Sequence, residues 1–133
     1  MDGASRGNPG PAGIGVVALN GGDTPVHQLS KPLGRATNNV AEYLALIYGL
    51  QWALGAGYTT IGVKTDSELL VRQVHGQYRV RDEHLRLFHG LAQDLLSHFT
   101  SWSLAHVPRE QNVQADRLAA AAAKRAAGAL AGL

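Results

Sequence analysis

The chain of 133 residues contains no cysteine, which excludes disulfide bonds, thiolate zinc sites and a cysteine nucleophile. It has no apolar run long enough to span a bilayer, and its N-terminus does not show the pattern of a signal peptide. The chain also lacks a large excess of charge of one sign, because its net charge is only +2. This balance permits nucleic-acid binding without requiring it. We therefore expect a soluble, cytoplasmic protein that does not act at a membrane.

Hydrophobic residues make up 45% of the chain, which is enough for one core in a chain of single-domain length. Glycine and proline predict an irregular, turn-rich stretch over residues 5–13, after a strand region that holds Asp2. A β-branched run predicts a strand over 14–20, and a turn at Asn20–Asp23 leads into a returning strand over 24–33.

After Thr37 the spacing of apolar residues becomes helical. Leu44, Ile47, Leu50 and Leu54 share one face of a helix that Asn38 or Asn39 can cap and that Gly55 or Gly57 can end. The remaining pattern predicts a strand over 59–65, a short helix over 67–75 with Ser67 near its start, a helix over 82–98 capped by Asp82, a strand over 101–107 and a last helix from about 112.

Hairpins followed by alternating helices and strands predict an α/β protein with a mixed sheet and helices packed on its faces. We expect one domain over residues 1–127 and a flexible Ala/Gly-rich tail over 128–133.

Four of the ten acidic residues occupy positions that are unusual for a carboxylate. Asp2 precedes a glycine-rich turn, Glu42 lies in the first turns of an apolar helix, Asp66 ends a strand, and Asp116 falls on the first turn of the last helix. Four converging carboxylates would need divalent cations to be tolerated, and oxygen ligands suit Mg²⁺ or Mn²⁺. Two such ions roughly 3.5–4 Å apart can cleave a phosphodiester without a protein nucleophile.

Each acid also has an ordinary interpretation. An isolated carboxylate is usually a solvated surface charge, Asp66 can cap the helix that follows it, and Asp116 can stabilise a helix N-terminus by its charge. Spacing in the sequence does not show whether the four side chains meet.

Four segments, in this order and spacing, resemble the conserved motifs of type 1 ribonucleases H. They cover nearly the whole chain and are DGASRGNPGPAG at 2–13, TNNVAE at 37–42, TDS at 65–67 and VPREQNVQADRLA at 107–119. The resemblance implies a ribonuclease H-like α/β fold, with a five-stranded mixed sheet and helices on both faces. It also implies endonucleolytic hydrolysis of the RNA strand of RNA–DNA hybrids with two metal ions, leaving 5′-phosphate and 3′-hydroxyl ends.

The resemblance assigns roles to individual residues. The metal-binding and catalytic carboxylates are Asp2, Glu42, Asp66 and Asp116, with Glu42 near the RNA 2′-hydroxyl. Asn8, Asn38 and Asn39 match residues that contact the hybrid, and Arg35 and Thr37 match a pocket for a phosphate of the DNA strand. Amides can donate to and accept from a 2′-hydroxyl, and guanidinium groups bind phosphate, so the residue types suit these roles.

Two further residues are candidates for an assisting group in proton transfer or product release. His106 precedes Asp116 by ten residues, and Arg109 follows it in the next loop, where it can also contact substrate. A half-buried structural histidine is the alternative interpretation of His106.

The chain departs from the longer members of that family in two places. Only residues 75–81 connect the middle helices, which is typical of the compact branch without a basic protrusion. Tyr78, Arg79 and Arg81 form a small substitute patch or a solvated loop, and we expect weak, salt-sensitive substrate binding.

The second departure is at the start, where only Met1 precedes Asp2. We expect that upstream residues are missing, that another segment fills the gap, or that neighbouring chains exchange strands to complete the sheet.

Other functions remain open at this point. A domain of the same fold that binds hybrids with weakened catalysis is the main alternative. An integrase or a junction resolvase lacks the Asn-Asn-x-x-Glu arrangement. A metal phosphatase or a nucleotide-binding domain is a further alternative, but the sequence contains neither a P-loop nor a Rossmann glycine fingerprint.

Overall fold

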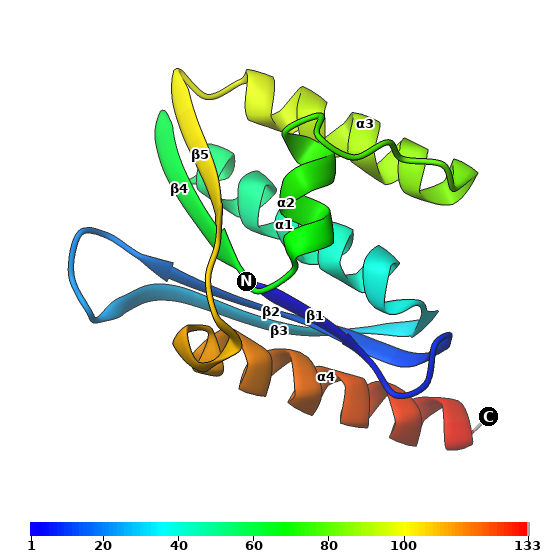
Figure 1. Ribbon diagram of the computed structural model, residues 1–133. Coiled ribbons are helices and arrows are strands. Elements are labelled where there is room, and N and C mark those ends of the chain that lie inside the picture. The colour runs from blue at the N-terminus through cyan, green and yellow to red at the C-terminus, as the bar shows by residue number, and fades with distance from the viewer. Residues whose placement is uncertain (133) are drawn as a thin grey trace.

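The computed structural model describes residues 1–132, and within them the chain forms five strands, four α-helices and one 3-10 turn in the expected order (Figure 1). The elements are β1 (Asp2–Ser5), β2 (Gly10–Leu19), β3 (Pro25–Ala36), α1 (Asn38–Gly55), β4 (Thr60–Thr65), α2 (Glu68–Val74), α3 (Glu83–Ser97), β5 (Ser101–His106), η1 (Arg109–Gln111) and α4 (Val113–Ala131). The α/β class predicted from the sequence is confirmed.

The five strands are hydrogen-bonded in two groups. β1, β2 and β3 form an antiparallel sheet in that order, and β4 pairs in parallel with β5. The amino group of Met1 links the groups by donating a hydrogen bond to the carbonyl oxygen of Lys64 at 2.9 Å. Among residues 1–132 no strand pairing joins β1 to β4, so the single mixed sheet expected from the sequence is interrupted there.

Helices cover both faces of the antiparallel sheet (Figure 1). α1 packs on the face that carries Ile14 and Val16, where Leu46 and Leu50 are almost fully buried. α3 packs against α1, and α4 covers the opposite face of the sheet. The core thus lies between β1–β2 and α1, next to the start of β1.

The interface between β2 and α4 is made of glycine and alanine. A Cβ atom at Gly13 would lie 2.4 Å from the backbone nitrogen of Ala123, and one at Gly15 would lie 2.1 Å from the carbonyl oxygen of Ala115. Only glycine allows the two backbones to approach this closely. The prediction of irregular structure over residues 5–13 is therefore wrong at both ends: Ser5 belongs to β1, and β2 begins at Gly10, where its pairing with β3 starts.

The ends of the helices agree with the predicted caps except at α1. Ser67 and Asp82 accept hydrogen bonds from the first turns of α2 and α3. The cap of α1 is Thr37, whose Oγ1 accepts from the Val40 backbone at 3.2 Å, so the prediction of Asn38 or Asn39 is wrong. Thr37 has the extended backbone that a capping residue needs, whereas both asparagines are already helical.

The last helix continues into the segment expected to be a tail. Residues 128–131 belong to α4. The flexibility of the tail and the domain bounds 1–127 stay predictions. Leu133 lies outside the described residues. No helix within residues 1–132 is both long enough and apolar enough to cross a membrane.

Candidate active site

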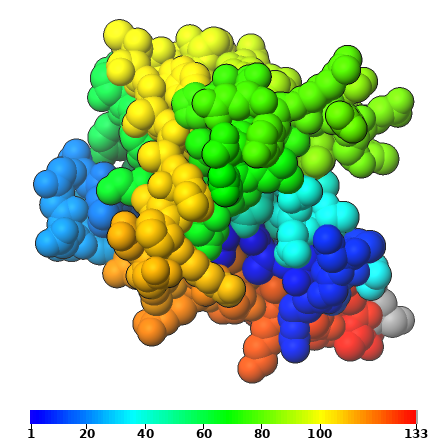
Figure 2. All heavy atoms as spheres, in the orientation of Figure 1, coloured from blue at the N-terminus to red at the C-terminus, as the bar shows by residue number. Residues whose placement is uncertain are grey.

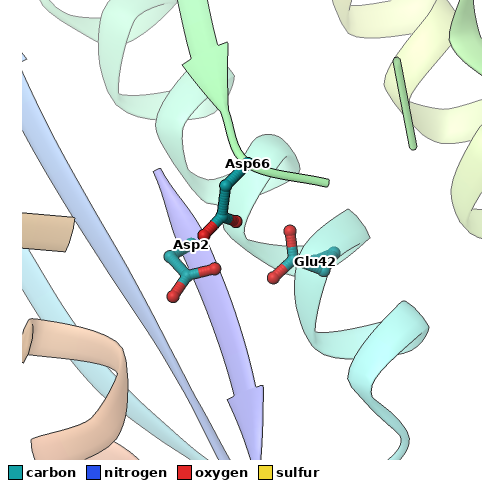
Figure 3. Close-up of side chains that lie close together, drawn as sticks. All are labelled: Asp2, Glu42 and Asp66. Carbon is teal, nitrogen blue, oxygen red and sulfur yellow. The ribbon is translucent and has the colours of Figure 1, made fainter. Parts of the chain in front are cut away.

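Three of the four predicted carboxylates meet at one point. Asp2, Glu42 and Asp66 each offer an oxygen atom, and these atoms lie within 4.8 Å of one another (Figure 3). Asp2 is 4% exposed and Glu42 is 7% exposed, while Asp66 is half-buried. Helix capping does not account for Asp66, since the cap of α2 is Ser67.

The local structure explains why these three side chains converge. Asp2 begins β1 and Asp66 follows β4, so both lie where the Met1–Lys64 hydrogen bond joins the two groups of strands. Glu42 is brought in by α1, which crosses β1 at Gly3. A Cβ atom at Gly3 would lie 2.2 Å from the carbonyl carbon of Ala41, so glycine permits this crossing.

Two hydrogen bonds hold the carboxylate of Glu42. The backbone N–H of Gly3 donates to Oε1 at 2.8 Å, and the buried hydroxyl of Thr65 donates to Oε2 at 3.4 Å. The same hydroxyl oxygen accepts from the backbone N–H of Ser67 at 3.1 Å. Thr65 therefore fixes both Glu42 and the turn that carries Asp66.

Buried Asn112 holds the start of β1. Its side-chain Nδ2 donates to the carbonyl oxygen of Met1 at 2.9 Å, and it directly precedes α4. Sequence reasoning singled out neither Asn112 nor Thr65. Both lie inside the motifs at 107–119 and 65–67, which is the signal that could have found them.

The fourth predicted carboxylate, Asp116, lies beside the cluster of three. It occupies the first turn of α4, as predicted, and its interaction with Asp2 helps to raise the pKa of Asp2. Its Oδ1 lies 3.5 Å from Nη2 of Arg109. Asp116 is thus next to the cluster, although among residues 1–132 the group of carboxylates close enough to share one ion contains only the other three.

Burial makes the cluster retain protons. It raises the pKa of Asp2 to about 10, and the neighbouring Glu42, Asp116 and Asp66 add to the shift. Burial also raises the pKa of Glu42, partly offset by its hydrogen bonds to Asp2 and to the Gly3 N–H, and lowers the pKa of the Met1 amino group. A hard divalent cation would stabilise the ionised carboxylates in place of the protons, so the donor set fits Mg²⁺ or Mn²⁺.

The predicted substrate-binding residues gather where β1, the β1–β2 loop and α1 meet. The Asn38 backbone N–H donates to Oδ1 of Asn8 at 3.0 Å, and Oδ1 of Asn38 accepts from the Ser5 N–H at 2.9 Å. Asn8, Asn38 and Asn39 are exposed. Arg35 is exposed near the end of β3, and Thr37 links that strand to α1.

His106 and Arg109 come from the end of β5 and from η1. His106 ends β5 opposite Thr65, one residue from Asp66, and it is exposed, so the alternative of a half-buried structural histidine is wrong. Arg109 is exposed in η1 and faces Asp116. Between α2 and α3 the chain has only a short connection, which carries Tyr78, Arg79 and Arg81.

Comparison with known proteins agrees with the motifs. Residues 1–122 match the reverse transcriptase-like family. The chain is 46% identical over 119 residues to ribonuclease HI of Halobacterium salinarum, an alignment that covers 90% of this chain and 60% of that protein. The chain therefore spans less than two thirds of that curated relative.

Solved structures resemble this one over almost the whole chain. The crystal structure of RNase H1 from Halobacterium salinarum superposes with a TM-score of 0.90 at 44% identity, covering 93% of this chain and 94% of that one. LC11-RNase H1, isolated from compost and crystallised with an RNA/DNA hybrid, gives a TM-score of 0.88 at 38% identity and covers 94% of each chain. With the four motifs, the carboxylate cluster and this agreement in fold, the chain belongs to the type 1 ribonuclease H family.

Proposed function

We propose that this chain is a metal-dependent endoribonuclease that hydrolyses the RNA strand of RNA–DNA hybrids and leaves 5′-phosphate and 3′-hydroxyl ends. The observation that carries the proposal is the buried convergence of Asp2, Glu42 and Asp66. The crystallisation of the similar LC11-RNase H1 with an RNA/DNA hybrid supports the substrate class. A cytoplasmic location is part of the proposal.

The carboxylates of Asp2, Glu42, Asp66 and Asp116 would hold two Mg²⁺ or Mn²⁺ ions. Bound ions of this kind supply an activated water for attack on the scissile phosphate and stabilise the leaving 3′ oxygen. The protein holds the ligands in place through Gly3 and Thr65, which orient Glu42, and through the short link from Thr65 to Asp66. Outer groups of this kind are needed to fix ligand geometry.

Recognition of the hybrid falls to the polar residues around the cluster. Asn8, Asn38 and Asn39 present exposed amides that can contact the RNA 2′-hydroxyl, which distinguishes RNA from DNA. Arg35 and Thr37 would bind a phosphate of the DNA strand. The Asn8–Asn38 hydrogen bond ties the β1–β2 loop to α1 and so holds these two asparagines next to each other.

His106 and Arg109 complete the proposed machinery. The imidazole of His106 is exposed next to the cluster and can transfer a proton to or from the reacting groups. Arg109 pairs with Asp116 and can contact phosphate. Alanine at each position tests these roles, because we expect slower turnover with an unchanged melting temperature. Full activity in both variants would refute the assignment.

Cleavage of a labelled RNA–DNA hybrid, measured in Mg²⁺ and in Mn²⁺, tests the proposal as a whole. We expect only the RNA strand to be cut, and we expect Asp66→Asn to lower the rate at least about a hundredfold because it removes a metal ligand. Asp94→Asn is the matched control, since Asp94 is exposed on α3. A folded protein that cuts neither strand in either metal would overturn the proposal.

A second candidate is a hybrid-binding module with weakened catalysis. It is favoured by one observation: Asp2 lies at the start of a four-residue strand joined to β4 by the Met1–Lys64 hydrogen bond. Hybrid binding without cleavage in the same assay would select this candidate.

A further inference from the structure

Helix α2 directly follows the turn that carries Asp66. It has seven residues and begins at Glu68, and its buried residues are Leu70, Gln73 and Val74. In the space-filling view α2 (green) lies at the surface between β5 (yellow) and atoms near the start of α1 (cyan) (Figure 2). The place of the Asp66 carboxylate therefore depends on how this short surface helix is held.

Gln73 is the polar member of the buried face of α2. Its side-chain Oε1 accepts a hydrogen bond from the hydroxyl group of Tyr43 at 2.7 Å. Both side chains are buried, since Tyr43 is 1% exposed and Gln73 is 6% exposed. Tyr43 directly follows Glu42 on α1. The bond therefore joins the helix that carries one carboxylate of the cluster to the helix that follows another.

The surroundings of this hydrogen bond are apolar. Leu46 of α1, Leu70 of α2 and Leu85 of α3 belong to the same core cluster as Tyr43. Apolar contacts are non-directional, so they alone would let α2 slide or rotate on α1. A hydrogen bond has a preferred length and angle, and an unpaired hydroxyl or amide costs free energy when it is buried. Arrangements of α2 that separate Tyr43 from Gln73 are therefore disfavoured.

The C-terminal end of α2 is held by α3. Nε2 of Gln93 donates to the carbonyl oxygen of Val74 at 2.8 Å, and Nε2 of His89 donates to that of Gln73 at 3.1 Å. The last carbonyl groups of a helix have no acceptor role within the helix, so these two side chains satisfy them. The helix is thus fixed to α3 at this end, and Tyr43 supplies its polar link to α1.

The other end of α2 is connected to the cluster through Thr65. The Ser67 N–H donates to Oγ1 of Thr65 at 3.1 Å, and that hydroxyl donates to Oε2 of Glu42 at 3.4 Å. At 1.5 Å per residue, Ser67 lies about 9 Å from Gln73 along the helix. A tilt of α2 at Gln73 is therefore transmitted to Ser67, and with it to the neighbouring Asp66.

We propose that Tyr43 and Gln73 are positioning residues of the carboxylate cluster. Their hydrogen bond sets α2 against α1 and so fixes the carboxylate of Asp66 relative to that of Glu42. The consequence for metal binding rests on the proposed metal-dependent function, whereas the placement of α2 does not. Without the bond the chain still folds, but the cluster holds a divalent cation more weakly.

A pair of variants separates the loss of position from the loss of stability. Tyr43→Phe leaves the amide oxygen of Gln73 buried without its partner, so we expect the melting temperature to fall by about 3–8 °C. The double variant Tyr43→Phe/Gln73→Leu replaces both polar groups by apolar ones, and we expect its melting temperature to lie within about 2 °C of the native value. Tyr58→Phe, which removes a hydroxyl beyond the other end of α1, is the matched control.

Two measurements on the double variant test the positioning role. Mn²⁺ binding, followed by titration calorimetry without nucleic acid, should weaken about tenfold or more, as when other groups that orient metal ligands are lost. In the metal-free protein the amide NMR signal of Ser67 should shift, because its hydrogen bond to Thr65 changes. The amide of Gly3, which donates to Glu42 from β1, should keep its native signal. Tyr58→Phe should alter neither the Mn²⁺ affinity nor these signals.

Both measurements are made well below the melting temperature of each variant, where Tyr43→Phe alone should show the same changes as the double variant. Native Mn²⁺ affinity together with a native Ser67 signal in these variants would overturn the proposal. A native chain that binds no Mn²⁺ would instead count against the proposed function. The Ser67 signal would then decide the positioning role by itself, because it is measured without metal and without RNA cleavage.

Discussion

Glu42 depends on neighbours that carry no charge. Its two oxygens accept from the Gly3 backbone and from the Thr65 hydroxyl, and these bonds join β1, α1 and β4. Because both carboxylate oxygens are hydrogen-bonded, rotation of the carboxylate would break at least one of these two bonds. The geometry of the cluster is therefore set in part by Thr65.

Replacing Thr65 by valine tests this dependence. The change keeps the shape but removes the donor to Glu42 and the acceptor for the Ser67 N–H, so we expect the Mg²⁺ concentration for half-maximal cleavage to rise about 10- to 100-fold. Thr60→Val in the same strand is the control, because Thr60 is exposed. An unchanged Mg²⁺ requirement in Thr65→Val would show that Glu42 is positioned without it.

The pKa shifts predict how stability depends on pH in the metal-free protein. The pKa of Asp2 is raised to about 10 and that of Glu42 is also raised, whereas both groups ionise near pH 4 in the unfolded chain. Between these values the folded state binds more protons, so the free energy of unfolding falls as pH rises. The Met1 amino group opposes this trend only between its lowered pKa and its ordinary 8.0.

We therefore expect the melting temperature in EDTA to fall from pH 5 to pH 9, more steeply than in Asp2→Asn, which removes one titrating group. Mg²⁺ should reduce the fall, because it stabilises the ionised carboxylates. The assigned pKa shifts would be contradicted if the melting temperature without metal rose with pH, and rose as much in the native chain as in Asp2→Asn.

The carboxylates of the cluster can be predicted from the sequence more readily than the residues that hold them in place. Asp2, Glu42 and Asp66 could be selected because each stands at the end of a strand or in an apolar helix, and the structure brings these three together. Thr65 and Asn112 could not be selected from local pattern, because their partners Glu42 and Met1 lie far away in the sequence.

At the scale of elements, the position of α4 depends on the small residues at its contact with β2. Its buried residues are all alanine, and they face the glycines of β2. The approach of backbone to backbone sets where the first turn of α4, and so Asp116, lies relative to β1. A side chain added at Gly13 or Gly15 would meet mainly backbone atoms of α4, which cannot rotate away.

Gly15→Ala is the sharpest test of this contact. Its Cβ would lie 2.1 Å from the carbonyl oxygen of Ala115, so we expect the free energy of unfolding to drop by about 1–3 kcal/mol, as in other overpacked cores. Gly90→Ala in α3 is the matched control, because its Cβ meets no atom within 4 Å and helix propensity predicts a gain of up to about 1 kcal/mol. Urea denaturation measures both. Equal stabilities would show that α4 can shift at no cost.

The helices and the later strands could be predicted from periodicity, and all of them lie within a few residues of the expected bounds. The first half of β2 could not, because Gly10, Pro11 and Gly13 disfavour a strand locally, whereas the structure pairs all three with β3 and packs Gly13 against α4. Tertiary packing overrides local preference there.

At the scale of the whole molecule, the charge is nearly balanced at +2. Binding of the proposed hybrid substrate would therefore depend on where the basic groups lie. Arg79 and Arg81 are exposed in the short connection between α2 and α3, where Tyr78 packs against Arg72. The interruption between β1 and β4 also belongs to this scale, because it depends on how the two groups of strands are placed.

We expect hybrid binding to weaken steeply with salt. Removing an arginine that contacts a phosphate should make the slope of log K, where K is the binding constant, against log salt shallower by about 0.9. The double variant Arg79→Ala and Arg81→Ala tests this by titration at several salt concentrations. Lys124→Ala, which removes an exposed charge on α4, is the control and should leave the slope unchanged. Equal slopes in the native chain and the double variant would exclude the connection from the binding surface.

The alanine and glycine contact between α4 and β2 has an entropic consequence. Alanine and glycine have no rotamers to lose on folding, so the docking of α4 orders the backbone alone. Dispersion is gained from the close approach of main-chain atoms, and among the atoms nearest to Gly13 and Gly15 only those of Leu118 belong to a side chain with rotamers. The separation of Asp116 from Asp2 therefore depends mainly on two backbones in contact, and little on the rotamers of side chains between them.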